Sequence, residues 1–395
     1  MSRKISQSGK TASALEADRC KVGKNYRPEL DVVRFLAFLL VYFSHLLLCT
    51  PIGLWSFLPT HQDPTRIVYA IGNSCSMGLC LFFTLSAYLI TGLLLKERDK
   101  NTVVSVRKFY IRRCLRIWPL YFFGIAIGVA LRNTHESLTQ SGLLWNLLFV
   151  GNFFRAAYGS SNNVMAPLWS ISIEEQFYVV WPWAMRWLSR RRLAVCALCF
   201  ILAANLALYI LGERHADTDT TVWSNTLVQF EMFAAGILLA LADKPAPRIF
   251  RGIGFALVFT GPLLWFIACF LFHAKQPAVA GMAVSGPALM AGYALIAVGC
   301  VAVLKGFCFF GPSRMPQWAV YMGKISYGLY VFHELGIRLA ICFFAPSDGF
   351  ISLIAAALLS LILTITAAKL SYTFLERPFL RIKRKYEIVH SKPIE

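Results

Sequence analysis

Long apolar runs separated by short basic segments make up most of this chain. The runs cover residues 32–52, 67–95, 117–131, 168–188, 193–211, 226–243, 252–271, 283–304, 325–345 and 350–374. A helix needs about 20 mostly apolar residues to cross a bilayer, and only the run 117–131 is too short. That run follows a basic segment, into which we expect its helix to extend. The pattern therefore predicts an all-α polytopic bundle of about ten transmembrane helices.

The basic segments set the expected topology. They lie before residue 34 and at 96–116, 186–192, 244–251, 305–324 and 377–387, whereas the loop 212–221 is acidic and polar. Lys and Arg accumulate on the cytoplasmic side of membrane proteins, and ten crossings place every basic segment there. Both termini are then cytoplasmic. A crossing at the apolar run 142–154 would move Arg190 outside, so we interpret this run as a re-entrant or interfacial helix that must be buried in protein or line a cavity.

Composition supports a membrane protein. Of 395 residues, 57% are hydrophobic and 15% are charged. The net charge of +19 could indicate nucleic-acid binding, but the basic residues occur in short runs between apolar segments, so we expect no nucleic-acid partner. We interpret residues 1–26 as a disordered cytoplasmic tail, 27–380 as the membrane domain and 381–395 as a second basic tail. The 11 cysteines form no metal-ligand or disulfide pattern, so we expect no metal and no bound cofactor.

The first span, RPELDVVRFLAFLLVYFSH, carries an ionisable pair. Arg34 and His45 are eleven residues apart, which on a helix is about 16 Å and nearly the same face. Ionisable side chains inside a membrane are costly and commonly line a functional path, so both are candidate site residues. The alternative is that Arg34 reaches the lipid surface and His45 is satisfied between helices.

The fourth span begins with the polar sequence SISIEEQ. By depth, Glu174 and Glu175 lie level with His45, and adjacent helical residues point about 100° apart, so one of them can face it. We favour Glu174 as the partner that fixes the histidine tautomer. The alternative is that both carboxylates cap or pair locally near the membrane surface.

The third span is preceded by VRKFYIRRCLRIWPLYFF. Arg113 and Arg116 share a helical face, and paired guanidinium groups suit the oxygens of a phosphate. The alternative is a cluster that only sets topology and contacts lipid headgroups.

At this point the motifs support a resemblance. The chain resembles the acyltransferase-3 family of membrane O-acyltransferases, which acylate O-antigen, Nod factors, exopolysaccharides and macrolides. The matching segments are PELDVVRFLAFLLVYFSH, LFFTLSAYLITGLLLKE, RRCLRIWPLYF, LWSISIEEQFYVVWP, ISYGLYVFHE and FLERPF, in the family's order from about residue 27 to 380.

The resemblance implies an acyl-CoA donor on the cytoplasmic side and an essential histidine, which by position is His45. It further implies donor binding by Arg34, Arg113, Arg116 and Tyr121. The matching segments indicate a pocket lined by Ser86, Trp169, Ser172, Tyr178, Ser326, Tyr327 and His333. We interpret His333 chiefly as a satisfied histidine that bridges helices.

Three departures from the family pattern stand out. Cys80 occupies a position that is usually acidic, Ser86-Ala87-Tyr88 replaces Ser-Gly-Phe, and Gln229 replaces an arginine that is common two residues before an acidic position. The larger side chains at 87 and 88 are expected to narrow the donor channel. The chain ends soon after Arg384, so we expect no appended extracytoplasmic domain.

The favoured function is transfer of an acyl group, with acetyl-CoA as the expected donor, to a hydroxyl of a carbohydrate, glycolipid or glycosylated small molecule. His45 acts either as general base or as acyl carrier, with Glu174 or Glu175 in support. The expected location is the bacterial inner membrane. The alternative is a transporter or flippase whose Arg34, His45, Glu174 and Glu231 form a substrate path, although the sequence shows no internal repeat.

Overall fold

Helices account for nearly all the regular structure in the computed structural model, which describes residues 26–48, 63–131, 139–159, 164, 166–243, 251–275, 284–311, 315–344 and 350–389. The α-helices are α2 (Pro28–Leu48), α3 (Asp63–Ser76), α4 (Gly78–Asn101), α5 (Val106–Ala130), α6 (Thr139–Leu147), α7 (Gly151–Tyr158), α8 (Trp169–Trp187), α9 (Arg190–Glu213), α10 (Thr226–Ala242), α11 (Arg251–Leu271), α12 (Gly286–Phe310), α13 (Gln317–Lys324), α14 (Ser326–Phe343), α15 (Phe350–Ser371) and α16 (Arg377–Arg384). Short 3₁₀ or π segments are η2 (Ala166–Leu168), η3 (Thr218–Val222) and η7 (Tyr372–Glu376). The described residues contain no strand, which confirms the predicted all-α class.

Seven of the helical stretches in the described residues are long and apolar enough to cross a membrane. They correspond to seven of the ten predicted spans. The other three, α8, α10 and α14, are also helical, but α10 has only 17 residues. Glu174, Glu175 and Gln176 in α8, and His333, Glu334 and Arg338 in α14, lower the mean hydropathy of those helices. The chain is thus a polytopic membrane protein, and two of its helices, α8 and α14, carry ionisable candidate site residues.

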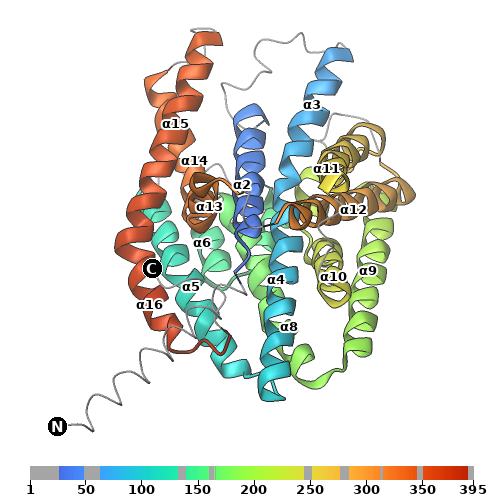
Figure 1. Cartoon of the computed structure of the whole chain (residues 1–395). Helices are drawn as coiled ribbons and strands as arrows, with labels where there is room; N and C mark the ends of the chain where they lie inside the picture. The colour runs from blue at the N-terminus through green and yellow to red at the C-terminus, as the bar shows by residue number, and fades with distance from the viewer. Residues whose placement is uncertain are drawn as a thin grey trace, which may run out of the picture.

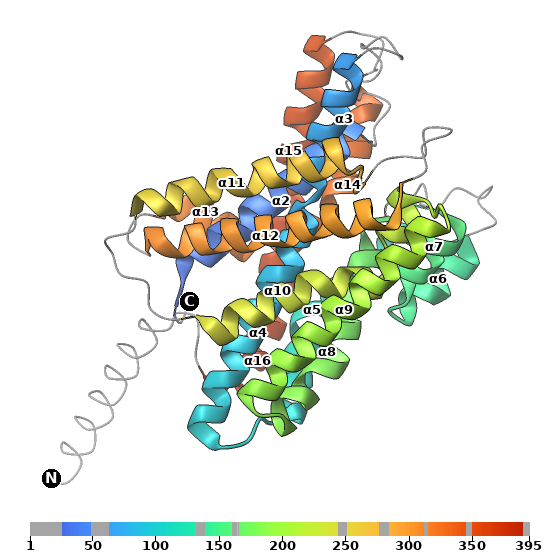
Figure 2. The ribbon, with the colours of Figure 1, turned by 90° about the vertical axis from the view of Figure 1, so that its right-hand side faces the viewer.

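Helix α4 occupies the centre of the bundle and is its most buried long segment. It packs against α10 on one side and α2 on another (Figure 1). Glycine allows this close approach, because a Cβ on Gly236 of α10 would lie 2.2 Å from the Thr84 carbonyl oxygen of α4, and one on Gly78 would lie 2.4 Å from the Ala37 oxygen of α2. Helices α11 and α12 run alongside each other across this core (Figure 2).

The predicted re-entrant segment consists of two short helices, α6 and α7. They have nine and eight residues, too few to cross a bilayer. The chain turns between them at Phe149, which has a φ of 56°. Gln176 of α8 donates a hydrogen bond to the Phe149 carbonyl at 3.0 Å, and Asn152 of α7 donates one to the Ser224 carbonyl at 3.1 Å. The turn between the two helices is therefore tied to the protein, whereas Leu144, Leu148 and Tyr158 are exposed, as on an interfacial segment.

The basic segments 96–116 and 377–387 meet at one end of the bundle. The end of α4, the start of α5 and α16 lie together there, at the lower end of the view in Figure 1. Arg112 of α5 ties them together, because it donates hydrogen bonds to Glu97 at 2.8 Å and to the Tyr386 carbonyl at 2.9 Å. Residues 385–389, expected to belong to a tail, thus pack on the membrane domain.

Candidate active site

A large cavity lies between α2, α4, α5, α8 and α14, and residues 387–389 also line it. Its open volume is about 520 Å³, which suits a small-molecule ligand. Eight of the predicted site residues line it: Arg34, Ser86, Arg113, Arg116, Glu174, Tyr178, Ser326 and Tyr327. Helices far apart in the sequence therefore bring most of the predicted residues to one place.

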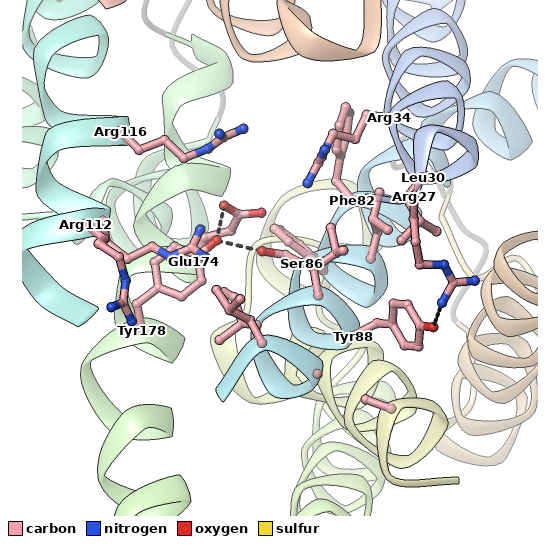
Figure 3. Close-up of a pocket in the computed structure, with 18 of the residues that line it drawn as sticks. Arg27, Leu30, Arg34, Phe82, Ser86, Tyr88, Arg112, Arg116, Glu174 and Tyr178 are labelled. Atoms are coloured by element: carbon pink, nitrogen blue, oxygen red, sulfur yellow. Dashed lines mark hydrogen bonds between the residues drawn. The ribbon is translucent and has the colours of Figure 1, made fainter. Parts of the chain in front are cut away.

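The guanidinium groups of Arg34, Arg113 and Arg116 line the cavity. Arg34 on α2 and Arg116 on α5 point toward the same space from opposite sides (Figure 3). Arg34 is paired with Asp31, one helical turn earlier. The Arg113 guanidinium lies over the ring of Tyr178, 5.3 Å from its centroid. The cavity as a whole has an excess of positive charge, because eight Arg or Lys residues and six Asp or Glu residues line it.

The Glu174 side chain of α8 points into the cavity, toward Arg113 and Arg116. The Tyr178 hydroxyl donates a hydrogen bond to its carboxylate at 2.8 Å, and Ser86 of α4 lies 2.6 Å from the same hydroxyl (Figure 3). Glu174 and Tyr178 are one helical turn apart, so a single face of α8 presents both. The chain Glu174–Tyr178–Ser86 therefore fixes one wall of the cavity.

A second polar network contributes Arg27, Tyr88 and Asp243 to the cavity lining. Asp243 accepts hydrogen bonds from Tyr88 at 2.6 Å and Lys305 at 2.7 Å, and forms a longer ion pair with Arg27 at 3.3 Å. Arg27 also donates to the Tyr88 hydroxyl. Burial alone would raise the pKa of Asp243, but the hydrogen bonds and charges of these partners outweigh it and lower the pKa. The network joins the start of α2, the middle of α4 and the C-terminal ends of α10 and α12.

The inner end of the cavity is formed by Ser170, Phe82 and Tyr330. The Tyr330 hydroxyl lies 2.7 Å from the Ser170 hydroxyl and 3.1 Å from the Pro167 carbonyl. The Tyr330 ring is also close to the ring of His333, with centroids 5.5 Å apart. A histidine therefore lies directly behind the cavity wall.

His45 belongs to a group that does not line the cavity. The rings of His45 and His333 are 4.8 Å apart, and Glu334 completes a trio whose ligand atoms all lie within 4.8 Å of one another. This is the only group of that kind among the described residues. Glu334 Oε1 accepts hydrogen bonds from Arg338 at 2.8 Å. The acidic residue grouped with His45 is thus Glu334, whereas Glu174 faces the arginines.

Further charges surround the outer side of His45. Asp219 in η3 lies 3.5 Å from Lys275 and 3.6 Å from Arg155. Burial alone would raise the pKa of Asp219, but these two cations outweigh it and lower the pKa. Lys275 and Arg155 are both close enough to act electrostatically on His45. Polar groups therefore continue from the histidines toward the end of the bundle opposite the cavity mouth.

Several predicted site residues contribute to packing instead of lining the cavity. Tyr121 is buried, donates to the Asn146 carbonyl at 2.7 Å and stacks on Phe149. Trp169 packs under Arg155, and Ser172 accepts from the Gly151 amide at 3.3 Å. Glu175 accepts from Trp118 at 3.5 Å.

The four residues of the alternative transport path do not line one common cavity. Arg34 and Glu174 line the cavity, but His45 and Glu231 do not. The four side chains expected to form one path therefore lie in separate surroundings.

The sequence analysis expected Tyr88 beside the donor channel, and Tyr88 does line the cavity, but it did not name Asp243, Ser170, Tyr330 and Lys383 as site residues, although they line the cavity too. Ser170 and Tyr330 lie within matching segments, so those segments carried the signal. Asp243 and Lys383 carried none, because an acidic residue after a span and a lysine in a basic run are common on any membrane protein.

Comparison with known proteins decides the family. A family model described as an acyltransferase domain matches residues 27–371. The chain belongs to this acyltransferase family. The predicted resemblance is confirmed, over nearly the whole membrane domain.

Two bacterial relatives illustrate what this acyltransferase is similar to. "Putative peptidoglycan O-acetyltransferase YrhL" of Bacillus subtilis is 26% identical over 354 residues, which are 82% of this chain and 54% of that protein. "Peptidoglycan O-acetyltransferase OatA" of Listeria monocytogenes is 26% identical over 387 residues, covering 91% of this chain and 56% of that protein. The chain thus spans about half the length of these curated relatives. No solved structure matches this acyltransferase.

Two departures from the family pattern contact each other. The Cys80 thiol lies 3.8 Å from Gln229 Oε1, and both residues are fully buried. Cys80 and Gln229, at which the sequence analysis noted departures, therefore face each other as a neutral pair. Gln229 also donates to the Trp223 carbonyl at 2.7 Å.

Proposed function

We propose that this acyltransferase moves an acyl group, preferably acetyl, from cytoplasmic acyl-CoA to a hydroxyl of a carbohydrate or glycosylated acceptor. The observation that carries the proposal is the cavity in which Arg34, Arg113 and Arg116 face one another. The proposal assigns the donor to this cavity and the transfer chemistry to the group around His45.

The charge of the cavity suits a phosphate-bearing donor. Guanidinium groups bind phosphate oxygens through planar pairs of N–H donors, and each such charge-assisted contact contributes about 1.5 to 3 kcal/mol. Arg112 also lines the cavity, but it is already bonded to Glu97 and Tyr386. Arg34, Arg113 and Arg116 are therefore the donor-binding residues in this proposal. Their end of the bundle carries the basic segments, which supports entry from the cytoplasm.

The acyl end of the donor would point toward Ser170 and Tyr330 at the inner end of the cavity. Transfer of an acyl group from sulfur to oxygen requires a base that removes the hydroxyl proton. His45 supplies it in this proposal, because its Nδ1 lies 2.9 Å from the Val41 carbonyl and must donate there. Its Nε2 then carries a lone pair that can accept a proton or an acyl group. Glu334 replaces Glu174 and Glu175 as the carboxylate that supports it.

The acceptor would reach His45 from the side of Asp219, Lys275 and Arg155. Both relatives are named as peptidoglycan O-acetyltransferases, one of them as putative, which supports a carbohydrate acceptor. Lys275 is itself held by Trp223, because its ammonium nitrogen lies 4.8 Å from the centroid of that buried ring. The proposal places the enzyme in the bacterial inner membrane, with donor and acceptor on opposite sides.

Replacement of Arg113 and Arg116 by alanine tests the donor site. We expect acyl-CoA affinity to fall roughly a hundredfold or more, because two charge-assisted contacts are lost. Binding of acetyl-CoA to detergent-purified protein, measured by calorimetry, provides the readout.

The matched control is the double variant Arg107→Ala with Lys108→Ala. These two residues lie on the same helix but are exposed and outside the cavity lining. If only the local positive charge matters, both double variants should lose the same affinity. Unchanged affinity in the Arg113 and Arg116 variant would refute the donor site.

A further inference from the structure

The two histidines of the site are adjacent and make the same kind of backbone contact. His45 of α2 and His333 of α14 meet edge to face, with an interplanar angle of 83°. Each Nδ1 lies beside a backbone carbonyl of its own helix, Val41 at 2.9 Å and Tyr330 at 2.6 Å. A carbonyl oxygen can only accept, so both Nδ1 atoms carry the proton. Both Nε2 atoms are then left with a lone pair.

The Nε2 atom of His333 is not satisfied in the way expected from the sequence. His333 is fully buried, and its Nε2 has no hydrogen-bond partner among the described residues. A buried acceptor without a partner costs free energy, typically about 1 to 3 kcal/mol. A residue that only bridged helices would have its second nitrogen bonded across the interface. The interpretation of His333 as a satisfied histidine is therefore wrong.

His333 also occupies an intermediate position. Tyr330, which lines the inner end of the cavity, contacts the His333 ring, and the His333 ring contacts His45. Beyond His45 lie Lys275 and Arg155. A proton released on the acceptor side of His45 would thus meet His333 before it reached the cavity.

We propose that His333 is a second catalytic residue that carries a proton between His45 and the leaving sulfur of the donor. This inference rests on the proposed acyl transfer. It goes beyond that function, because it assigns a route to the proton that must travel from the acceptor hydroxyl to the thiolate.

The relay begins and ends with both imidazoles neutral. The acceptor O–H bond breaks, His45 Nε2 takes the proton, and the oxygen forms a bond to the acyl carbon. The carbon–sulfur bond breaks, and its electron pair stays on sulfur. The proton then passes from His45 Nε2 to His333 Nε2 and from there to the thiolate, which restores both lone pairs. Glu334 stabilises the positive charge that the imidazoles share in transit, since its carboxylate belongs to the same group.

A pair of isosteric substitutions separates proton transfer from packing. His333→Gln removes the proton acceptor, whereas His333→Glu has nearly the same shape and retains a group that can take and return a proton. We expect His333→Gln to lower kcat about a hundred- to ten-thousandfold with acyl-CoA affinity unchanged, and His333→Glu to be at least about tenfold faster than His333→Gln. A packing role predicts the opposite order, because neutral glutamine is easier to bury than glutamate.

A double-variant cycle supplies the second readout. If both imidazoles serve one proton path, His45→Asn combined with His333→Gln should be about as slow as the slower single variant. If His333→Gln does not fold, His333→Asn takes its place, because its amide can still donate to the Tyr330 carbonyl.

Three results would overturn the relay. The first is near-normal turnover of the His333 variants while His45→Asn is inactive. The second is a double variant whose loss of kcat equals the product of the two single losses. The third is loss of wild-type turnover when a chelator is added, with recovery when Zn²⁺ is supplied. The last would mean that the lone pairs hold a metal ion. Full activity of His45→Asn would instead remove His45 from the mechanism and the relay with it, whereas the absence of acyl transfer by the wild-type protein would refute the proposed function itself.

Discussion

His45 is the residue on which the proposed chemistry depends most, and its substitution by asparagine is informative. Asparagine can still donate to the Val41 carbonyl, but it can neither accept a proton at neutral pH nor carry an acyl group. We expect His45→Asn to fold, to bind acyl-CoA normally and to lose about a hundred- to ten-thousandfold in turnover, or more if His45 carries the acyl group. Transfer of radiolabelled acetyl to a glycan acceptor measures it.

The same substitution at His215 is a suitable control. His215 is exposed and has a φ of 53°, a conformation that asparagine tolerates well. We expect His215→Asn to retain full turnover. Comparable activity of the two variants would remove His45 from the mechanism.

Sequence reasoning identified candidate site residues but could not assign their partners. Arg113 and Arg116 were predictable as a pair, because their spacing alone puts them on one face. Glu174 was predicted to lie level with His45, yet it faces Arg113, Arg116 and Arg34, and Arg34 is eleven residues from His45 on α2. Position along a span gives only an approximate height in the membrane, and the partner depends on how each helix is tilted and rotated against its neighbours. The identity of Glu334 as the carboxylate beside His45 required that packing.

At the scale of elements, the ten helices were predictable because long apolar runs have few alternatives in a bilayer. The two short helices α6 and α7 were foreseen only as a segment that does not cross. Their turn at Phe149 depends on contacts from α8, which lie outside any local pattern. The docking of residues 385–389 was likewise hidden, because it depends on Arg112 meeting the Tyr386 carbonyl.

The network around Asp243 should stabilise the packing of α2, α4, α10 and α12 around the cavity. Asp243→Asn removes the charge that Lys305 and Arg27 share, so we expect a loss of about 1 to 3 kcal/mol of stability at neutral pH. The lowered pKa of Asp243 means that this contribution is complete above the ordinary carboxyl value near 4 and disappears as the pH falls through the lowered value. The Tm difference between the two proteins in detergent should therefore shrink below about pH 4.

Asp99→Asn is the control for that measurement. Asp99 and Arg190 are both more than half exposed, with side-chain exposures of 64% and 58%, and they lie 3.7 Å apart. Such surface pairs contribute little. A Tm difference for Asp243→Asn that did not change with pH, or that equalled the one for Asp99→Asn, would contradict the role of the network.

On the scale of the whole molecule, the site forms a path with distinct ends. The arginine cavity opens where the basic segments meet, the two histidines lie behind its inner end, and Asp219, Lys275 and Arg155 follow on the far side. Such an arrangement allows a donor and an acceptor to approach one reaction centre from opposite sides of a membrane. It works only if the two ends of the bundle face different compartments.

Helix α9 provides a direct test of this orientation. It runs from Arg190 to Glu213, about 36 Å at 1.5 Å per residue, so its ends must lie on opposite sides of a bilayer. Thr218, in the loop predicted to be outside, is buried, but Arg214 and Arg191 are exposed at the two ends of α9. In a cysteine-free background, we expect an impermeant thiol reagent to label Arg214→Cys in intact cells and to label Arg191→Cys only after permeabilisation. The reverse pattern would place the arginine cavity outside and refute a cytoplasmic donor, and labelling of both sites in intact cells would show that α9 does not cross.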